Sequence, residues 1–129
     1  MTRIKICCIK NYDEALIAVK AGVDALGLVS EMPSGPGVIS IDEIEKIVKA
    51  VPPYVATNLL TSKSDFDEIS MQLKKCRCNT LQIVDRVDIN IFKKIRDAFP
   101  LLKIVQVVHV TDEKSVDEAK YFADYADAI

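Results

Sequence analysis

Residues 4–29, IKICCIKNYDEALIAVKAGVDALGLV, contain the pattern that decides the fold. The stretch opens with an apolar segment, residues 4–8, and passes into a helical pattern of apolar residues that stops at Gly22. A second apolar segment, residues 25–29, follows directly. Because two buried strands joined by an amphipathic helix form a parallel pair with a right-handed crossover, this stretch predicts a strand–helix–strand unit.

The same unit recurs along the rest of the chain. Two helix starts are marked by capping pairs, Asn11 with Glu14 and Ser40 with Glu43. Further helices are predicted from Ser64, across the apolar positions of 91–99, and from Thr111 or Asp112 to Ala123. The predicted strands after the second are 54–60, 80–84 and 103–108, and residues 126–129 open a sixth.

Two α/β architectures are compatible with this order of elements. Eight such units make a (β/α)8 TIM barrel of about 250 residues, so residues 1–129 supply a single partial barrel domain with strands 1–5, helices 1–5 and the start of strand 6. A flavodoxin-like open sheet needs only five strands. The barrel is favoured, because the receiver proteins of the open class need acids where Cys7 and Cys8 stand, and no glycine-rich phosphate loop follows the first strand.

The composition of the chain argues against two classes of binding partner, nucleic acids and membranes. The net charge is −2 with both signs mixed along the chain, so no basic stripe predicts binding to nucleic acid. No segment approaches the roughly 18 apolar residues of a membrane span, and no secretory leader precedes the first strand. We therefore expect a cytoplasmic protein that contacts neither nucleic acid nor membrane.

The four cysteines form two pairs. Cys7 and Cys8 close the first predicted strand, whereas Cys76 and Cys78 precede the fourth. In a parallel sheet the two pairs then lie at opposite ends of strands about 17 Å long and cannot share a metal ion. We expect four reduced thiols and no metal site.

The first thirty residues resemble the phosphoribosylanthranilate isomerase family of tryptophan biosynthesis. Residues 5–10, KICCIK, and 21–29, AGVDALGLV, are similar to that family's K-I-C-G-I and A-G-A-D-A-L-G-F segments in order and spacing. Weaker likeness continues at Ser40, at residues 52–55 (PPYV), at 80–83 (TLQI) and at 104–107 (IVQV). The resemblance implies a TIM-barrel aldose–ketose isomerase that carries out an Amadori rearrangement without a cofactor.

The resemblance also implies a role for Cys7. In this family the cysteine of K-I-C-G removes the C2′ proton of the sugar, and strand alternation sends Cys7 inward and Cys8 outward. The family's general acid, an aspartate of strand 6, and its phosphate-binding loops fall beyond residue 129. Gly37 aligns with the family's carboxylate-binding arginine and Val84 with its histidine, while Cys8 stands at the motif's glycine. The 129-residue chain alone is therefore expected to be inactive.

Three further residues are candidate contacts of a phosphosugar substrate. Gln82 and Gln106 are expected to point toward the barrel mouth, and His109 ends the fifth strand. Each is also compatible with a structural role. The alternative to an enzyme is a non-catalytic α/β binding or assembly module. An inner sheet face bearing Leu28, Val84 and Val108 predicts self-association of the chain.

Overall fold

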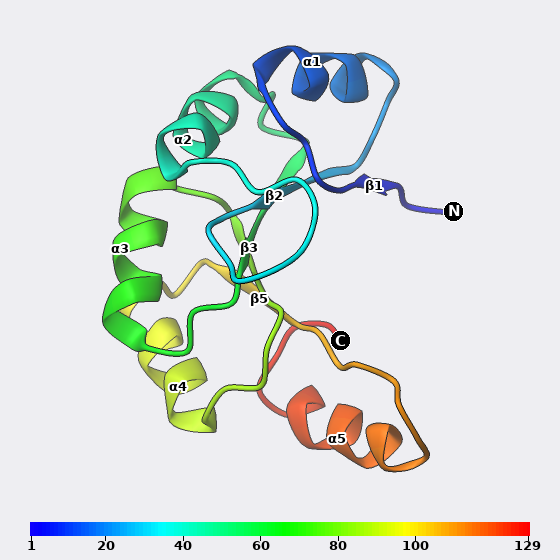
Figure 1. Cartoon of the computed structure of the whole chain (residues 1–129), viewed down its shortest axis with the longest axis vertical. Helices are drawn as coiled ribbons and strands as arrows, with labels where there is room; N and C mark the ends of the chain where they lie inside the picture. Colours follow the sequence, from blue (N-terminus) through cyan, green and yellow to red (C-terminus); the bar gives the residue numbers. More distant parts are fainter.

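The computed structural model describes all residues from Met1 to Ile129 and contains one parallel sheet with its helices in an arc around one side (Figure 1). Both termini lie on the other side of the strands, away from α2, α3 and α4 (Figure 1). The strands are β1 (Lys5–Ile6), β2 (Ala25–Val29), β3 (Ala56–Thr61), β4 (Thr80–Ile83) and β5 (Lys103–Gln106). The helices are α1 (Tyr12–Lys20), α2 (Ile41–Ala50), α3 (Phe66–Cys76), α4 (Ile89–Ala98) and α5 (Lys114–Ala123).

Strand order separates the two predicted architectures. The sheet runs β1-β2-β3-β4-β5, and every neighbouring pair is parallel. A flavodoxin-like sheet has the order 2-1-3-4-5 with helices on both faces, whereas sequential order with helices on one face is the arrangement of a TIM barrel. The barrel-type fold is confirmed, with a sheet that is not closed.

The core lies between the sheet and the arc of helices. One face of the sheet meets the apolar sides of α2, α3 and α4, and the side chains there are almost completely buried. They include Leu26, Leu28, Leu59, Leu81, Ile83 and Ile104 from the strands, and Ile44, Ile47, Ile69, Phe92 and Ile95 from the helices. Burying each such side chain contributes roughly 1.5–3 kcal/mol relative to leaving it in water.

Two of the residues predicted for the open, inner face of the sheet lie in this core instead. Leu28 has an exposed fraction of 0% and lies in the layer between sheet and helices, and Val108 packs against the same layer. The residues that share the opposite face with Gln82 are Leu60 on β3 and Val105 on β5, its direct partners in register. The prediction was wrong for Leu28 and Val108 because both faces of these strands are apolar, so hydrophobicity does not tell one face from the other.

The helix starts agree with their predicted caps. The Asn11 side chain accepts a hydrogen bond from the Glu14 amide at 2.9 Å, and the Ser40 hydroxyl accepts one from the Glu43 amide at 3.2 Å. For α3 the capping residue is Asp65, one position after the predicted start, and its carboxylate accepts from the Asp67 and Glu68 amides. These bonds satisfy backbone donors that the first helical turn leaves free.

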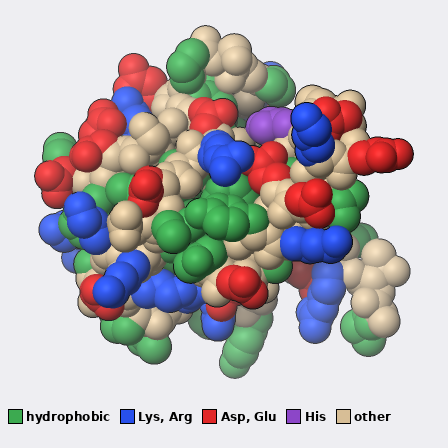
Figure 2. Space-filling view, turned by 90° about the horizontal axis from the view of Figure 1, so that it is seen from below, with side chains coloured by type: hydrophobic (Ala, Val, Ile, Leu, Met, Phe, Trp, Pro, Cys, Tyr) green, Lys and Arg blue, Asp and Glu red, His purple; other side chains and the backbone are tan.

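The surface mixes charges of both signs. Seen from below, Lys and Arg side chains alternate with Asp and Glu around a central apolar patch (Figure 2). The longest helix, α3, has 11 residues, and none of the helices has the length and apolarity that a bilayer crossing requires.

Candidate active site at the carboxyl ends of the strands

Cys7 follows directly on β1, at the carboxyl end of that strand. Its side chain lies on the inner face, because the Cys7 thiol covers the position where a side chain of Gly27 would begin. The Ile9 amide donates to the Gly27 carbonyl at 3.3 Å, so the segment after β1 stays attached to β2. The inward direction predicted for Cys7 thus agrees with the structure.

Cys8 interrupts the predicted first strand. It has a φ of +60°, in the left-handed region that residues with a side chain seldom adopt. The chain therefore turns after Ile6, and β1 is two residues long in place of five. The family that the sequence resembles has glycine at this position, the one residue for which this backbone conformation carries no steric cost.

Gly37 lies against Cys8. A Cβ added to Gly37 would stand 2.5 Å from Cys8 Cβ and 2.7 Å from Cys8 Cα, and Gly37 itself has a φ of +76°. The loop after β2 thus approaches so closely that position 37 admits no side chain. An arginine at this position, as the resemblance would place it, is incompatible with the backbone found here.

The Cys8 thiol has a raised pKa. Burial raises the pKa of Cys8, and the adjacent Cys7 thiol raises this pKa further, while the Lys5 ammonium partly opposes both effects. Cys8 therefore keeps its proton at neutral pH. Of the two cysteines, Cys7 is the exposed one, and it stands on the face of the sheet that the helices leave open.

Lys5 and Gln82 meet across the inner face. The Lys5 ammonium on β1 donates to the Gln82 side-chain oxygen on β4. Both residues line a cavity of about 590 Å³ whose other lining residues come mainly from β5 and α5. The inward direction expected of Gln82 is confirmed. The contact with Lys5 was missed at the sequence level, although Lys5 has the same facing parity as Cys7.

His109 stands in the loop between β5 and α5. Its ring nitrogen Nε2 lies 2.9 Å from the Val84 carbonyl, at the carboxyl end of β4. The Ser115 hydroxyl donates to the His109 carbonyl at 3.3 Å and accepts from the Thr111 amide at 3.0 Å. His109 is therefore held at the same end of the sheet as Cys7.

Gln106 borders the same cavity as Lys5 and Gln82, but its side chain faces the opposite way from that of Gln82. Its partner in register on β4 is Ile83, a core residue, so its side chain points toward the helices, and its exposed fraction is 0%. Its amide nitrogen donates to the backbone carbonyls of Asp85 and Val107, at 3.1 Å and 2.8 Å. The prediction that Gln106 faces the barrel mouth was wrong, for the same reason as for Leu28.

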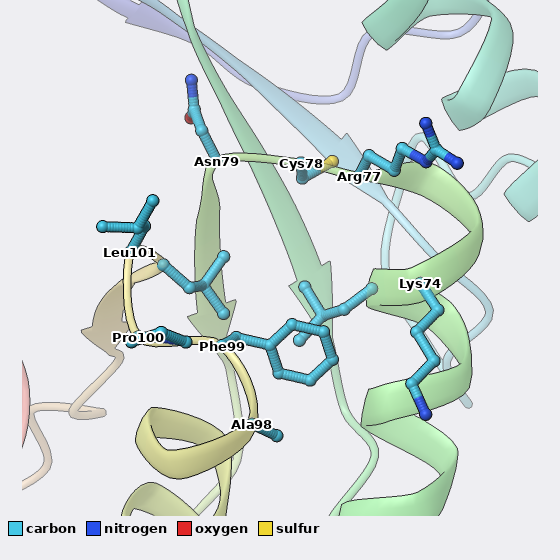
Figure 3. A pocket seen from close by; sticks show the side chains of 10 residues that line it. Lys74, Arg77, Cys78, Asn79, Ala98, Phe99, Pro100 and Leu101 are labelled. Atoms are coloured by element: carbon cyan, nitrogen blue, oxygen red, sulfur yellow. The ribbon is translucent and has the colours of Figure 1, made fainter.

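The second cysteine pair lies at the opposite end of the sheet, as predicted. Cys76 ends α3 and Cys78 precedes β4, and both are buried. The neighbouring Cys76 thiol and burial raise the pKa of Cys78. Cys78 borders a groove of about 500 Å³ between the ends of α3 and α4, where the Phe99 ring extends toward α3 (Figure 3). This groove is remote from the carboxyl ends of the strands.

The sequence of this chain is similar to the sequences of one kind of enzyme. The chain is 27% identical over 129 residues to the N-(5′-phosphoribosyl)anthranilate isomerase of Methanocella arvoryzae, covering 100% of this chain and 61% of the relative. It is 31% identical over 127 residues to N-(5′-phosphoribosyl)anthranilate isomerase 2 of Methanosarcina mazei, covering 98% of this chain and 56% of that protein. The chain therefore spans less than two thirds of the length of these relatives. No family model matches it.

Solved structures agree with the sequence relatives. The phosphoribosyl anthranilate isomerase of Thermotoga maritima superimposes with a TM-score of 0.86 at 26% identity, over 97% of this chain and 59% of that one. A phosphoribosyl anthranilate isomerase in complex with reduced 1-(o-carboxyphenylamino)-1-deoxyribulose 5-phosphate gives a TM-score of 0.85 at 25% identity, over 100% and 66% of the two chains. The resemblance found in the first thirty residues is thus confirmed over the whole chain.

Proposed function

We propose, from the premise that this chain is a divergent relative of the phosphoribosylanthranilate isomerases in both sequence and fold, that it contributes the general base of an Amadori rearrangement. The substrate is N-(5′-phosphoribosyl)anthranilate and the product is the corresponding 1-deoxyribulose phosphate. The observation that carries the proposal is the inward, exposed thiol of Cys7 at the carboxyl end of β1, the end at which barrel enzymes place their catalytic side chains.

The reaction needs one proton donor and one proton acceptor. Protonation of the ring oxygen opens the sugar to a Schiff base, and removal of the C2′ proton then gives an enamine that becomes the ketose. The Cys7 thiolate takes the C2′ proton. In the resembling family the donor is an aspartate of strand 6, so the base and the acid come from different parts of the barrel.

Cys7 is the better candidate of the two adjacent thiols on physical grounds. A thiol acts as a base only after it has lost its own proton. Burial and the neighbouring thiol raise the pKa of Cys8, which disfavours its thiolate form. Its side chain also packs against the backbone of Gly37 and away from the inner face.

Gln82 and His109 are the proposed contacts of the sugar phosphate. Gln82 reaches the inner face beside Lys5, and His109 stands beside the end of β4. The Lys5 ammonium adds a positive charge that favours an anionic substrate in the cavity that Lys5 and Gln82 line. Gln106 is not proposed as a contact, because its side chain is enclosed on the helix side.

The function is tested with a hybrid protein, in which residues 1–129 are joined to the part of the M. mazei relative that this chain does not cover. We expect the hybrid to convert N-(5′-phosphoribosyl)anthranilate and the 129-residue polypeptide alone to leave it unchanged, because the proposed acid is supplied only in the hybrid. A folded hybrid that neither binds the reduced product analogue nor turns over the substrate contradicts the proposal.

We further propose that the 129-residue polypeptide associates with a second copy of itself. At one edge of the sheet Ile4, Ile6 and Ile17 are exposed, and at the other edge Val110, Val116 and Ile129 are exposed. Apolar side chains of this number at sheet edges favour covering by a partner. The alternative of a non-catalytic assembly module would leave this association intact and the hybrid inactive.

A further inference from the structure

Gly27 lies in the middle of β2, on the inner face and in register with Asn58 of β3. Its backbone does not adopt a left-handed conformation, so the conformation of the strand does not require a glycine here. A glycine inside a strand costs stability, because it packs no side chain and loses more backbone entropy on folding. The close approach of another group is the remaining reason for it.

That group is Cys7. A Cβ built on Gly27 would stand 2.5 Å from Cys7 Sγ, 3.0 Å from Cys7 Cα and 3.2 Å from Cys7 Cβ. All three distances are shorter than ordinary van der Waals contact between carbon or sulfur atoms. The Cys7 thiol therefore occupies the volume that any side chain at position 27 would need, and it lies directly on the backbone of β2.

The backbone around this contact is fixed from both sides. Lys5 of β1 pairs with Ala25 of β2, and beyond β1 the Ile9 amide donates to the Gly27 carbonyl itself. Cys7 thus stands between two attachments to the same strand and has no freedom to move away along β2. The absence of a side chain at position 27 leaves the space in which the Cys7 thiol lies.

We infer that Gly27 is a positioning residue for Cys7: it forms a side-chain-free seat on β2 that holds the thiol on the inner face at the carboxyl end of β1. The catalytic meaning of this seat rests on the proposed function, because a base is useful only if its sulfur faces the substrate proton. Misplacing a catalytic group by about 1 Å is sufficient to lower a rate on the order of a hundredfold.

The seat is tested first by stability, with no substrate present. Gly27→Ala should lower the urea midpoint of the polypeptide, and the same substitution in a Cys7→Ala background should lower it by less than half as much, because the overlap with the thiol is gone. In a Cys8→Ala background the full effect of Gly27→Ala should return. If Gly27→Ala alone fails to fold, the Gly27→Ala/Cys7→Ala double variant should fold again. Equal shifts in all backgrounds, or a double variant that stays unfolded, overturn the inference.

The second test uses the hybrid protein. Gly27→Ala should lower kcat at least tenfold and change KM less than threefold, since the substrate contacts remain and the base is displaced. A Gly27→Ala hybrid with unchanged kcat overturns the positioning role even where the stability coupling is found. A hybrid that is inactive with Gly27 in place, together with the expected stability coupling, removes the proposed function and leaves the seat for the Cys7 thiol established.

Discussion

At the scale of single residues, the adjacent Cys7 and Cys8 each depend on a glycine in a neighbouring segment. Cys7 needs a glycine beneath it, at position 27, so that its thiol has room on the inner face. Cys8 occupies a left-handed position that itself favours glycine, and its side chain meets Gly37 of the next loop. One thiol is thus held toward the open face and the other is held in the wall of the site.

The backbone strain at Cys8 predicts that glycine is a more stabilising replacement than alanine at this position. Cys8→Gly should be more stable than Cys8→Ala by about 1 kcal/mol, since only glycine adopts a φ of +60° without a steric cost. At most positions alanine is the more stabilising of the two residues. Urea denaturation of both variants measures the difference. An alanine variant as stable as the glycine variant contradicts the strain at this position.

The raised pKa of Cys8 and the burial of Cys76 and Cys78 predict which cysteine an alkylating reagent modifies first. Burial and the Cys7 thiol raise the pKa of Cys8, and Cys76 and Cys78 are enclosed at the other end of the sheet. Iodoacetamide at neutral pH should therefore modify Cys7 first among the four cysteines. Peptide mass spectrometry after brief exposure identifies the site. Earlier modification of Cys8 would contradict the assignment of the neutral thiol.

At the scale of elements, β1 is the short strand on which the site depends. Its start is fixed by Asp24, whose carboxylate accepts hydrogen bonds from the Ile4 amide at 2.8 Å and from the Arg3 guanidinium at 2.7 Å. The Asp24 amide donates in return to the Ile4 carbonyl at 2.9 Å. The residue before β2 thus holds the strand that carries Cys7.

This anchor is sensitive to pH. The Ile4 amide and the Arg3 guanidinium lower the pKa of Asp24 in the folded state. A lowered folded-state pKa means that the stabilisation is complete above the unfolded value of about 3.9 and is lost as pH falls through the folded value. Asp24→Asn should therefore be less stable than the native chain at pH 6, and the difference should shrink as pH falls below about 4.

The matched control for Asp24→Asn is Asp97→Asn. Asp97 lies on the exposed side of α4, and its side chain makes no hydrogen bond or ion pair. Thermal unfolding of both variants between pH 3 and pH 6 provides the comparison. A pH-independent loss of stability in Asp24→Asn would show that its hydrogen bonds, and not its charge, hold β1.

The elements also show what the sequence does and does not predict. The helix starts at Asn11 and Ser40 were predictable because their caps are local signals, and the alternation of Lys5 and Cys7 predicted the inward direction of the Cys7 thiol. The facing of Leu28 and Gln106 was not predictable, because strands covered by helices are apolar on both faces. The left-handed conformation at Cys8 was not predicted, because the residue itself is not glycine. The glycine of the resembling motif at this position was the signal that could have indicated it.

At the scale of the whole molecule, five sequential strands and an arc of helices leave the sheet open on one face and at the β1 edge. At the β5 edge the predicted start of a sixth strand is present, because Ala128 forms a parallel bridge with Val105. Two edges of exposed apolar residues, one beside α1 and one beside α5, remain. In a closed barrel each edge meets a neighbouring βα unit. We expect a second copy of the chain to cover these exposed residues.

The 129-residue polypeptide should therefore sediment as a species heavier than its 14.3 kDa monomer. Ile17→Lys, at the edge beside α1 where Ile17 is 68% exposed, should shift it toward the monomer. Met71→Lys, at the 72% exposed Met71 of α3, should leave the assembly unchanged. Analytical ultracentrifugation distinguishes these outcomes, and a stable monomer that binds no hydrophobic dye contradicts self-association.

The most direct test of the central claim is the turnover of N-(5′-phosphoribosyl)anthranilate by the hybrid protein with Cys7→Ala and, separately, with Cys8→Ala. Removal of a general base typically lowers a rate by about a hundredfold to ten-thousandfold. We predict a loss of at least that lower size with Cys7→Ala and a retained rate within about tenfold with Cys8→Ala, because the Cys8 side chain points into the wall of the site. Equal losses in the two variants, or a Cys7→Ala hybrid as fast as its parent, would contradict the assignment of Cys7 as the base.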